Sequence, residues 1–418
     1  GIVGGSDVSN YTRYNFRINS EHKLFKDFLT VGEQVSFVYK KNNGVGVGNQ
    51  YNNTLRGAFG TSPITPIYSD NNNYDSPYND TTNSDWYKGD GNPYGAMMTN
   101  TNNENKNATF SGNVYAELRP IKNLKIRTTF GAVYGSSEYR SFKPLYRFSI
   151  YDYNEIRTSV SQNMNHSLGM TWTNTATYDW KIKEHAFNAL IGMEAYRYEG
   201  TYLSGGNGAL KEGFDDWEHA YVSNGTASSS TDGLSASGNP HDEGRSVSYF
   251  ARLGWNWKET YMINATLRSD GSSKFAPSHQ WGYFPAAAAA WRISDEAFME
   301  NTRDWLDNLK LRVSYGTSGS DNIDASLWRE TWKTEQITVD GEKVTTYVPG
   351  DMKGNPDLKW ETTISRNLGV DFGFFNNWVR GSLDYYWNTT KNILMKVPID
   401  AASGYSYQFQ NVGKTSNK

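Results

Sequence analysis

The feature that most constrains this chain is a regular alternation of apolar and polar side chains in stretches of about ten residues. In one such stretch, the first parity holds Leu124, Ile126, Phe130, Ala132 and Tyr134. The other parity holds Lys125, Arg127, Thr129, Gly131 and Val133. Because strand side chains repeat every two residues, one face is apolar and the other mostly hydrophilic. The links between stretches are short and long in turn, which is typical of a β-barrel that crosses a lipid bilayer.

The composition favours one continuous architecture over residues 1–418. A length of 418 residues would suit two or three soluble domains, but no linker or composition shift marks a boundary. The mean hydropathy of -0.72 and the lack of an apolar run near 18 residues exclude transmembrane helices. These two features do not exclude a membrane barrel, because half of each barrel strand is polar. The net charge of -3 is spread out, so we expect no nucleic-acid partner, and the absence of cysteine excludes disulfides and thiolate sites.

The pattern predicts an all-β fold with twelve antiparallel strands in six pairs. The predicted pairs are about 11–23 with 28–41, 108–120 with 124–136, 165–181 with 185–198, 245–257 with 261–270, 281–293 with 308–317, and 364–374 with 378–394. A partial thirteenth strand is predicted to begin near Tyr405, and a helical turn is expected within 294–307. In bacterial barrels the short turns are periplasmic. We therefore expect the long connections to be extracellular: about 42–107, 138–162, 199–244, 271–280, 318–363 and 396–404.

Charged residues should face the pore. In the first strand Tyr14 and Phe16 alternate with Arg13 and Arg17, and an arginine in lipid near the midplane costs about 2–4 kcal/mol. Arg366 is an exception that shares parity with apolar residues, and the outer rim or a β-bulge would explain it. An aromatic girdle is expected near the short turns, from Trp180, Trp257, Tyr261 and Trp378.

A soluble β-propeller or β-sandwich also uses strands and turns, but would bury the apolar parity in a dry core. The alternating link lengths argue against both folds. Predicted strands of about 10–15 residues also exceed the soluble average of about 5–6.

No catalytic constellation is found, so we expect no enzyme activity and no cofactor. Metalloprotease, Walker and nucleophile-elbow motifs are missing, and the six histidines are scattered. An acidic run in the first long connection offers oxygen ligands for Ca²⁺, although its spacing is not that of an EF-hand. This run consists of Asp70, Asp75, Asp80, Asp85 and Asp90.

Aromatic residues in the long connections are candidates for substrate binding. Six lie among amide and carboxylate side chains: Trp86, Tyr87, Tyr94, Trp217, Trp328 and Trp332. Tyr74, Tyr78 and Tyr221 share this setting. Such rings stack on a ligand face while polar neighbours bind its hydroxyls, which suits a sugar or a peptide. Rings that only hold long loops together, or a flexible solvated tract, fit the composition equally well.

Three stretches resemble the SusC-like family of TonB-dependent outer-membrane transporters of Bacteroidetes. The first comprises residues 267–275 (LRSDGSSKF), 281–285 (WGYFP) and 291–299 (WRISDEAFM). The second is 309–316 (LKLRVSYG), with Gly319 and Ile323 beyond it. The third is 355–361 (NPDLKWE), followed by 369–373 (GVDFG). We expect the segment 270–273 to be a structural turn, in which Gly271 permits the bend and Asp270 and serine cap the backbone.

The resemblance implies an antiparallel transmembrane barrel of 22 strands, of which about 12 lie in this chain. It implies a signal peptide, a plug domain and further strands outside residues 1–418. It also implies import of a large oligosaccharide or peptide across the outer membrane of a Gram-negative bacterium, with a SusD-like lipoprotein and TonB as partners. It transfers no substrate-binding residue to this chain.

Two other hypotheses stay open. One is a surface adhesin or structural barrel without active transport, which a plug and a TonB-contacting segment before Gly1 would exclude. The other is a passive closed barrel of twelve strands. It is disfavoured because unpaired strand edges are not tolerated in lipid.

Overall fold

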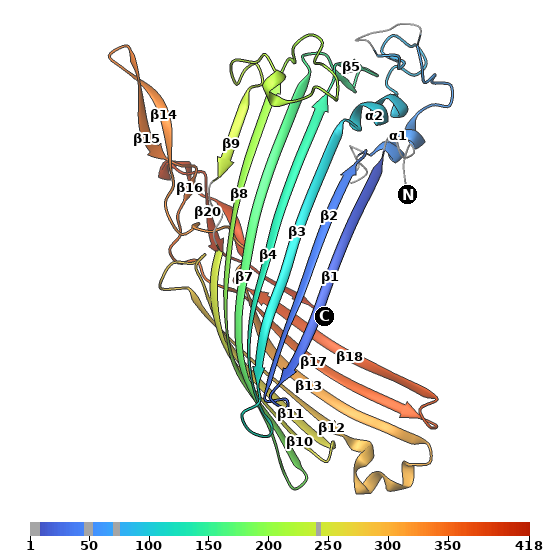
Figure 1. Ribbon diagram of the computed structural model, residues 1–418, viewed down its shortest axis with the longest axis vertical. Helices are drawn as coiled ribbons and strands as arrows, with labels where there is room; N and C mark the ends of the chain where they lie inside the picture. Colours follow the sequence, from blue (N-terminus) through green and yellow to red (C-terminus); the bar gives the residue numbers. More distant parts are fainter. Residues whose placement is uncertain (1–8, 46–52, 70–75, 240–243) are drawn as a thin grey trace.

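A computed structural model describes residues 9–45, 53–69, 76–239 and 244–418, and an antiparallel sheet of 14 strands forms most of it (Figure 1). Twelve long strands make up this wall: β1 (Asn10–Leu24), β2 (Leu29–Asn43), β3 (Asn103–Leu118), β4 (Leu124–Lys143), β7 (Ser159–Ile182), β8 (His185–Gly208), β10 (Gly244–Trp257), β11 (Tyr261–Ser272), β12 (Trp281–Arg292), β13 (Leu306–Ser320), β17 (Glu361–Phe374) and β18 (Val379–Lys391). They pair in sequence order and confirm the six predicted hairpins.

The described wall is curved but not closed. Short β21 (Lys414–Asn417) pairs with β18 at one edge, β1 forms the other edge, and β9 (Ser235–Asn239) pairs only with β8. Within the described residues nothing joins the two edges. The hypothesis of a closed twelve-strand barrel is therefore wrong for this chain, because closure needs β1 to pair with the last strand.

The predicted strands end within two residues of the observed limits at the short turns, but several, including β3, which begins at Asn103, are longer than predicted at the opposite end. We call these the turn end and the loop end of the wall. At the loop end, β4, β7 and β8 extend past their predicted limits to Lys143, Ser159 and Gly208. The alternation fades in these extensions, where runs such as 204–208 (SGGNG) carry no apolar side chain. The strands stay hydrogen-bonded to each other there, although apolar and polar side chains no longer alternate.

The thirteenth strand also differs from the prediction. Residues near Tyr405 lead into β20 (Tyr407–Asn411), which forms a small separate sheet with β16 (Met352–Lys353) and β19 (Leu394–Pro398). The strand that joins the wall is β21.

Tight turns at the turn end hold backbone in the left-handed region. Examples are Asn123 (φ 70°), Lys183 (φ 54°), Lys258 (φ 51°) and Asn376 (φ 56°). Left-handed turn residues match the right-handed twist of the flanking strands. The longer link between β12 and β13 contains the expected helical turns, η3 (Ile293–Asp295) and η4 (Ala297–Thr302).

The wall has an apolar face and a polar face. On the apolar face, residues at least 45% exposed include Phe16, Phe110, Phe130, Trp172, Ile191, Leu267, Val313 and Leu383. A β-sandwich or propeller would bury these side chains, so the structure contradicts the soluble alternatives. The polar face carries Arg17, Gln34, Asn113, Arg127, Thr171, Glu194, Arg268, Arg312 and Asp371.

Aromatic rings form a continuous row on the apolar face near the turn end. Trp180 stacks on Phe187 at 5.0 Å, Trp257 on Tyr261 at 5.4 Å, and Tyr261 on Trp291 at 6.3 Å between ring centroids. His185 connects the first pair to Trp257. This row fits the predicted interfacial girdle.

A seam in the wall separates the loop-end half of β12 from β13. β12 pairs with β11 as far as Trp281, but with β13 only from Ala286 to Arg292. The ladder stops at Pro285, which has no backbone N–H. Phe284 is buried beside it, and a Cβ on Gly319 would lie 2.0 Å from its ring. Glycine is needed there because the phenyl ring rests on bare backbone.

The long connections carry their own small elements at the loop end. They are α1 (Thr54–Gly60), α2 (Pro93–Asn100), β5 (Tyr146–Arg147), β6 (Tyr153–Asn154), η2 (Val222–Asn224), β14 (Trp332–Val339), β15 (Glu342–Pro349) and η5 (Ala401–Ser403). Among the residues that the structure describes, no helix is long and apolar enough to cross a membrane.

Candidate functional site

Ion-pair clusters line the polar face of the wall. Arg312 of β13 reaches Asp371 at 2.7 Å and Asp384 at 3.1 Å on the next two strands. Arg268 pairs with Asp270 at 2.7 Å, and Glu194 lies 3.5 Å away. Each cluster joins neighbouring strands and leaves part of its charge open to solvent. Such a surface can bind polar ligands by hydrogen bonds.

A shallow groove of about 490 Å³ runs across the polar face of β1, β2, β3, β4, β7 and β8. Its floor is made of small residues, and its polar walls include Arg17, Gln34, Asn113, Tyr196 and Tyr198. Because the floor lacks bulky side chains, an extended polar ligand can approach the backbone there.

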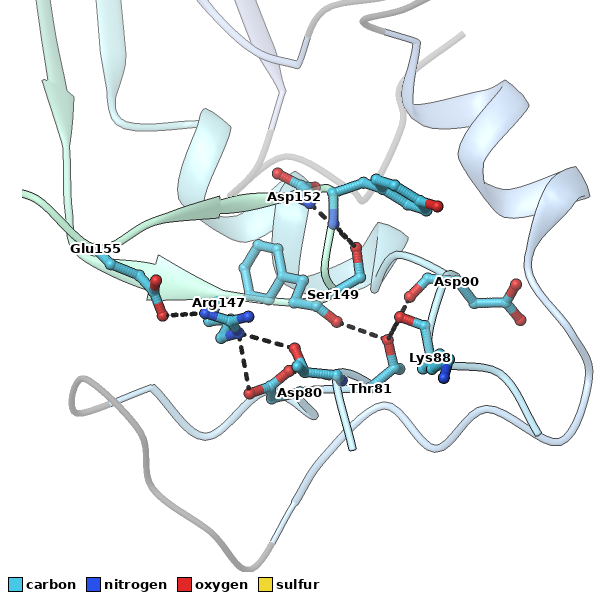
Figure 2. Close-up of polar contacts among 11 residues, drawn as sticks. Asp80, Thr81, Lys88, Asp90, Arg147, Ser149, Asp152 and Glu155 are labelled. Carbon is cyan, nitrogen blue, oxygen red and sulfur yellow. Dashed lines mark hydrogen bonds and ion pairs between the residues drawn. The ribbon is translucent and has the colours of Figure 1, made fainter. Parts of the chain in front are cut away.

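A folded loop cluster covers the loop end, and Figure 2 shows its polar contacts. At its centre Thr81 is fully buried, with its hydroxyl 2.6 Å from the carbonyl of Asp90 and 3.0 Å from that of Phe148. Phe148 is also fully buried and stacks on Tyr146 at 4.6 Å. Thr81 thus ties the 81–90 segment to the β5–β6 hairpin.

Arg147 and Ser149 hold the same hairpin in place. The Arg147 guanidinium forms an ion pair with Glu155, donates to the Thr82 hydroxyl at 2.8 Å and lies 3.7 Å from Asp80. The buried Ser149 hydroxyl accepts from the backbone N–H of Asp152 at 3.1 Å. These contacts hold the β5–β6 hairpin against residues 80–82 (Figure 2).

Beside this cluster lies a pocket of about 710 Å³, which we call the rim pocket. Its polar lining includes Arg56, Asp90, Lys143, Tyr146, Tyr151 and Asp152. Tyr146 donates to one carboxylate oxygen of Asp152 at 3.1 Å. Burial raises the pKa of Asp152, and Tyr146 and Lys143 offset part of this effect. Burial also raises the pKa of Tyr146. A half-buried carboxylate beside an exposed ring is a suitable hydrogen-bonding partner for a ligand hydroxyl or ammonium group.

Thr81→Val is expected to loosen the loop cluster while leaving the wall intact. The substitution keeps the shape but removes the buried hydroxyl that lies within hydrogen-bond distance of the carbonyls of Lys88, Asp90 and Phe148, which costs about 1–3 kcal/mol. Limited proteolysis of the assembled full-length protein should cleave 76–100 faster. Thr345→Val, on the exposed β14–β15 hairpin, is the control. Equal cleavage of both variants would contradict the central role of Thr81.

The structure distributes the six predicted aromatic residues over three loops that lie well apart in Figure 1. Trp86 is 85% exposed, Tyr87 is half-buried, and Tyr94 packs edge-on against Tyr68 and Tyr78, each at 5.9 Å. Tyr94 therefore holds its own loop together. None of the six lines the rim pocket.

The other three candidates lie on two further loops. Trp217 packs beneath the Arg140 guanidinium at 4.0 Å and against the buried cluster around Phe142. Trp328 is half-buried beside Arg329, and Trp332 is 62% exposed at the start of β14. Their substrate-binding role stays a prediction.

The acidic run is only partly described. Asp70 and Asp75 lie outside the described residues, as does Tyr74. Asp80 lies near Arg147, and Asp90 accepts from the Ser62 N–H at 2.9 Å. In the described part of the chain, no three acidic or histidine side chains gather as a metal site would require. Calcium binding by this run stays a prediction.

Sequence reasoning missed the rim pocket. Its key residues lie in 143–152, within the long connection 138–162, where the sequence predicts no strand or helix. The one available signal was local: Tyr146, Phe148, Tyr151 and Tyr153 crowd aromatic rings into eight residues, as a small packed hairpin requires. The partners of these rings lie about 60 residues away, and no local pattern identifies them.

Three of the transporter-like stretches meet at the loop end beside the seam. A buried cluster, which we call the rim core, consists of Phe275, Leu327, Met352 and Leu358. Trp360 packs on it, lies 5.5 Å from both Phe275 and Phe284, and donates its indole N–H to the carbonyl of Gln280 at 2.8 Å. The stretches 267–275, 281–285 and 355–361 therefore pack together as one unit.

The expected role of segment 270–273 needs correction. Asp270 and Gly271 still belong to β11, so neither forms the bend. Asp270 binds Arg268, and Gly271 makes room for Trp281, whose ring would lie 3.2 Å from a Cβ. Only Ser272 acts as predicted, since its hydroxyl accepts from the backbone of Lys274.

Known proteins with a β-barrel fold match this chain. The family model for the TonB dependent receptor-like β-barrel matches residues 39–418. TonB-dependent receptor P26 of Formosa agariphila is 30% identical, over 100% of this chain and 40% of that protein. TonB-dependent receptor SusC of Bacteroides thetaiotaomicron is 26% identical, over 98% of this chain and 41% of that protein. The chain spans about two-fifths of the length of these relatives.

A solved structure of the RagAB peptide transporter contains a similar wall. The similarity covers 98% of this chain and 43% of that one, with 25% sequence identity and a TM-score of 0.75.

Proposed function

Because this chain belongs to the TonB-dependent receptor-like β-barrel family, we propose that the whole protein imports a large polar nutrient, an oligosaccharide or a peptide, across the outer membrane. Proteins of this family lie in the outer membrane of Gram-negative bacteria. That location puts the apolar face in lipid and the polar face in the barrel lumen. The turn end is then periplasmic, and the loop end is extracellular.

The observation that carries this proposal is the charge distribution over the wall. Clustered arginines and carboxylates occupy the lumen side, whereas the lipid side of the strands is mainly apolar, with Glu33 and Arg366 among the charged exceptions. A lumen of this kind offers hydrogen bonds to sugar hydroxyls and peptide groups along a transport path. An enzyme would need a convergent set of reactive groups, and transport needs only such a lining.

The whole protein is proposed to include parts that this chain lacks. Residues 1–418 would form the middle of a 22-strand barrel, preceded in the full chain by a plug and a TonB-contacting segment. A SusD-like surface lipoprotein is the proposed partner at the extracellular end, and TonB the proposed source of energy. The likeness to SusC and to the RagAB peptide transporter supports this assignment.

Deletion of the gene in its host tests the import proposal. We expect slower growth on at least one oligosaccharide or peptide source, and loss of uptake of the labelled nutrient when TonB is inactivated. A lipoprotein should copurify with the full-length protein. Undiminished growth on every such source would contradict import and favour the surface adhesin.

The rim pocket is proposed to contact the nutrient before it enters the lumen. Tyr151→Ala removes the exposed ring, and Asp152→Asn removes the carboxylate charge while it keeps an acceptor for Tyr146. Each should weaken nutrient binding about tenfold, the equivalent of about 1.4 kcal/mol. Calorimetry on the purified full-length protein measures this. Ile156→Ala, on a side chain that is 86% exposed and outside the pocket, separates the pocket from a general loop effect. Unchanged affinity in both pocket variants would exclude the pocket.

A further inference from the structure

Arg366 is a cation on the lipid-facing side of the wall. It lies on β17 between Ile364 and Leu368, and Leu368 is 47% exposed on the apolar face. The pairing on both sides of Arg366 is regular, with Tyr315 of β13 opposite it on one side and Trp387 of β18 on the other. The only register shift in these ladders is at Leu306, so a β-bulge does not explain the position of Arg366.

Two aromatic rings hold the Arg366 side chain. Its guanidinium carbon lies 5.7 Å from the ring centroid of Tyr315 and 5.7 Å from that of Trp387. Among the described residues no carboxylate or other hydrogen-bond acceptor contacts this guanidinium. The Tyr315 hydroxyl and the Trp387 indole N–H also lack an acceptor within the described chain. Three neighbouring side chains on the lipid side therefore carry donors that no acceptor among the described residues uses.

Several other cations of the wall have a carboxylate partner. On the apolar face, Arg197 pairs with Glu199 at 2.7 Å, and Glu104 lies 2.6 Å from Lys41. On the polar face Arg312 has two carboxylates. A guanidinium against lipid without an anion is unfavourable, because its charge is poorly solvated there. The missing anion must come from outside the described protein.

The height of Arg366 indicates where this anion is found. It lies eight residues along β17 from Phe374, at the turn end. At about 3.3 Å per residue and a tilt of about 40°, Arg366 is about 20 Å above that end, in an apolar band about 25 Å tall. Arg366 is therefore about 5 Å below the upper edge of the band, and a long arginine side chain can extend from there to the outer-leaflet headgroups, where Tyr and Trp are enriched.

We propose that Arg366, with Tyr315 and Trp387, binds the phosphate group of an outer-leaflet lipid. Guanidinium matches phosphate through two parallel charge-assisted hydrogen bonds, and the two rings keep its plane in position. The tyrosine hydroxyl and the indole N–H are further donors to the same anion. The site depends on the membrane location of the wall and not on which nutrient is imported.

Lipid titration of the full-length protein in detergent, followed by native mass spectrometry, tests this proposal. The probes are lipid A, lipid A stripped of its phosphates, phosphatidylglycerol and inorganic phosphate. We expect lipid A to bind the unaltered protein about tenfold more tightly than its phosphate-free form. Equal binding of these two would overturn the proposal, and this comparison needs no variant. Binding of inorganic phosphate with neither phosphate lipid bound would overturn it as well.

Variants assign the effect to Arg366. Arg366→Gln should abolish the preference for phosphate, whereas Arg366→Lys should keep much of it, because lysine retains the charge and loses only the planar fork. Arg252→Gln, an exposed arginine on the polar face, should leave the preference unchanged. A preference that survives Arg366→Gln would overturn the assignment. Under the proposal, tighter Arg366-dependent binding of lipid A alone identifies lipopolysaccharide as the source of the phosphate. Tighter binding of both lipid A and phosphatidylglycerol shows that any phosphate headgroup suffices.

Discussion

Phe130→Arg is expected to impair assembly of the barrel in the outer membrane, whereas Arg127→Ala is expected to be mild. Phe130 lies on the apolar face, 47% exposed, six residues from the turn end of β4. At about 3.3 Å per residue and a tilt of about 40°, this position is about 15 Å up an apolar band about 25 Å tall, close to its middle. An arginine there costs about 2–4 kcal/mol.

Arg127, three residues away, faces the lumen. Its guanidinium lies over the Tyr115 ring at 3.8 Å and is 3.9 Å from Glu117, which also pairs with Arg119 at 2.9 Å. Loss of Arg127 therefore leaves Glu117 with a partner and should cost about 0–1 kcal/mol. Heat-modifiable migration of the full-length protein, extracted from outer membranes, measures the assembled fraction. If the two variants lose the same fraction, the lipid and lumen faces have been assigned the wrong way round.

Phe275→Ala is expected to unfold the rim core, which lies beside the seam on the extracellular side. Phe275 has no exposed surface and packs with Leu358 and Met352 in the rim core. Truncation of a buried phenylalanine to alanine costs about 3–5 kcal/mol, since it removes apolar contacts and leaves a cavity. The loop that contains Leu327 and Met352 should detach, while the membrane-embedded strands keep their pairing.

Hydrogen exchange of the full-length protein measures this effect as faster exchange over residues 321–360. Phe59→Ala is the matched control, because Phe59 is 91% exposed on α1, and its loss should change stability by less than about 0.5 kcal/mol. Unchanged exchange in the Phe275 variant would show that the loop is held by other contacts.

The membrane-spanning half of the fold could be predicted because lipid and lumen impose opposite polarities on alternate residues. Strands such as β1 and β10 match their predicted limits to within one residue. Beyond the membrane both faces of β7 and β8 meet water or other loops, so the alternation that identified them disappears. The extra length of these strands comes from pairing with each other, which no local pattern records.

The candidate site was harder to predict for a related reason. Loop aromatics such as Tyr94 and Trp217 suit ligand binding and loop packing equally well in sequence; the structure shows that both rings pack in their loops, and their substrate-binding role stays a prediction. The rim pocket depends on contacts between segments far apart in sequence, such as the hydroxyl of Thr81 on the carbonyl of Phe148. The alternation identifies Arg366 as an exception. It could not identify the two rings beside Arg366, because the register of neighbouring strands places them there.

The seam between β12 and β13 makes the wall mechanically uneven. The ladders between most of the other long strands run along nearly the full length of the shorter strand. Above Pro285, β12 and β13 have only side chains between them, including the Thr317 hydroxyl on the Pro285 carbonyl at 3.0 Å. A pulling force that spreads the extracellular mouth should tear the wall there first, with Phe284 leaving its place before any hydrogen-bonded rung breaks.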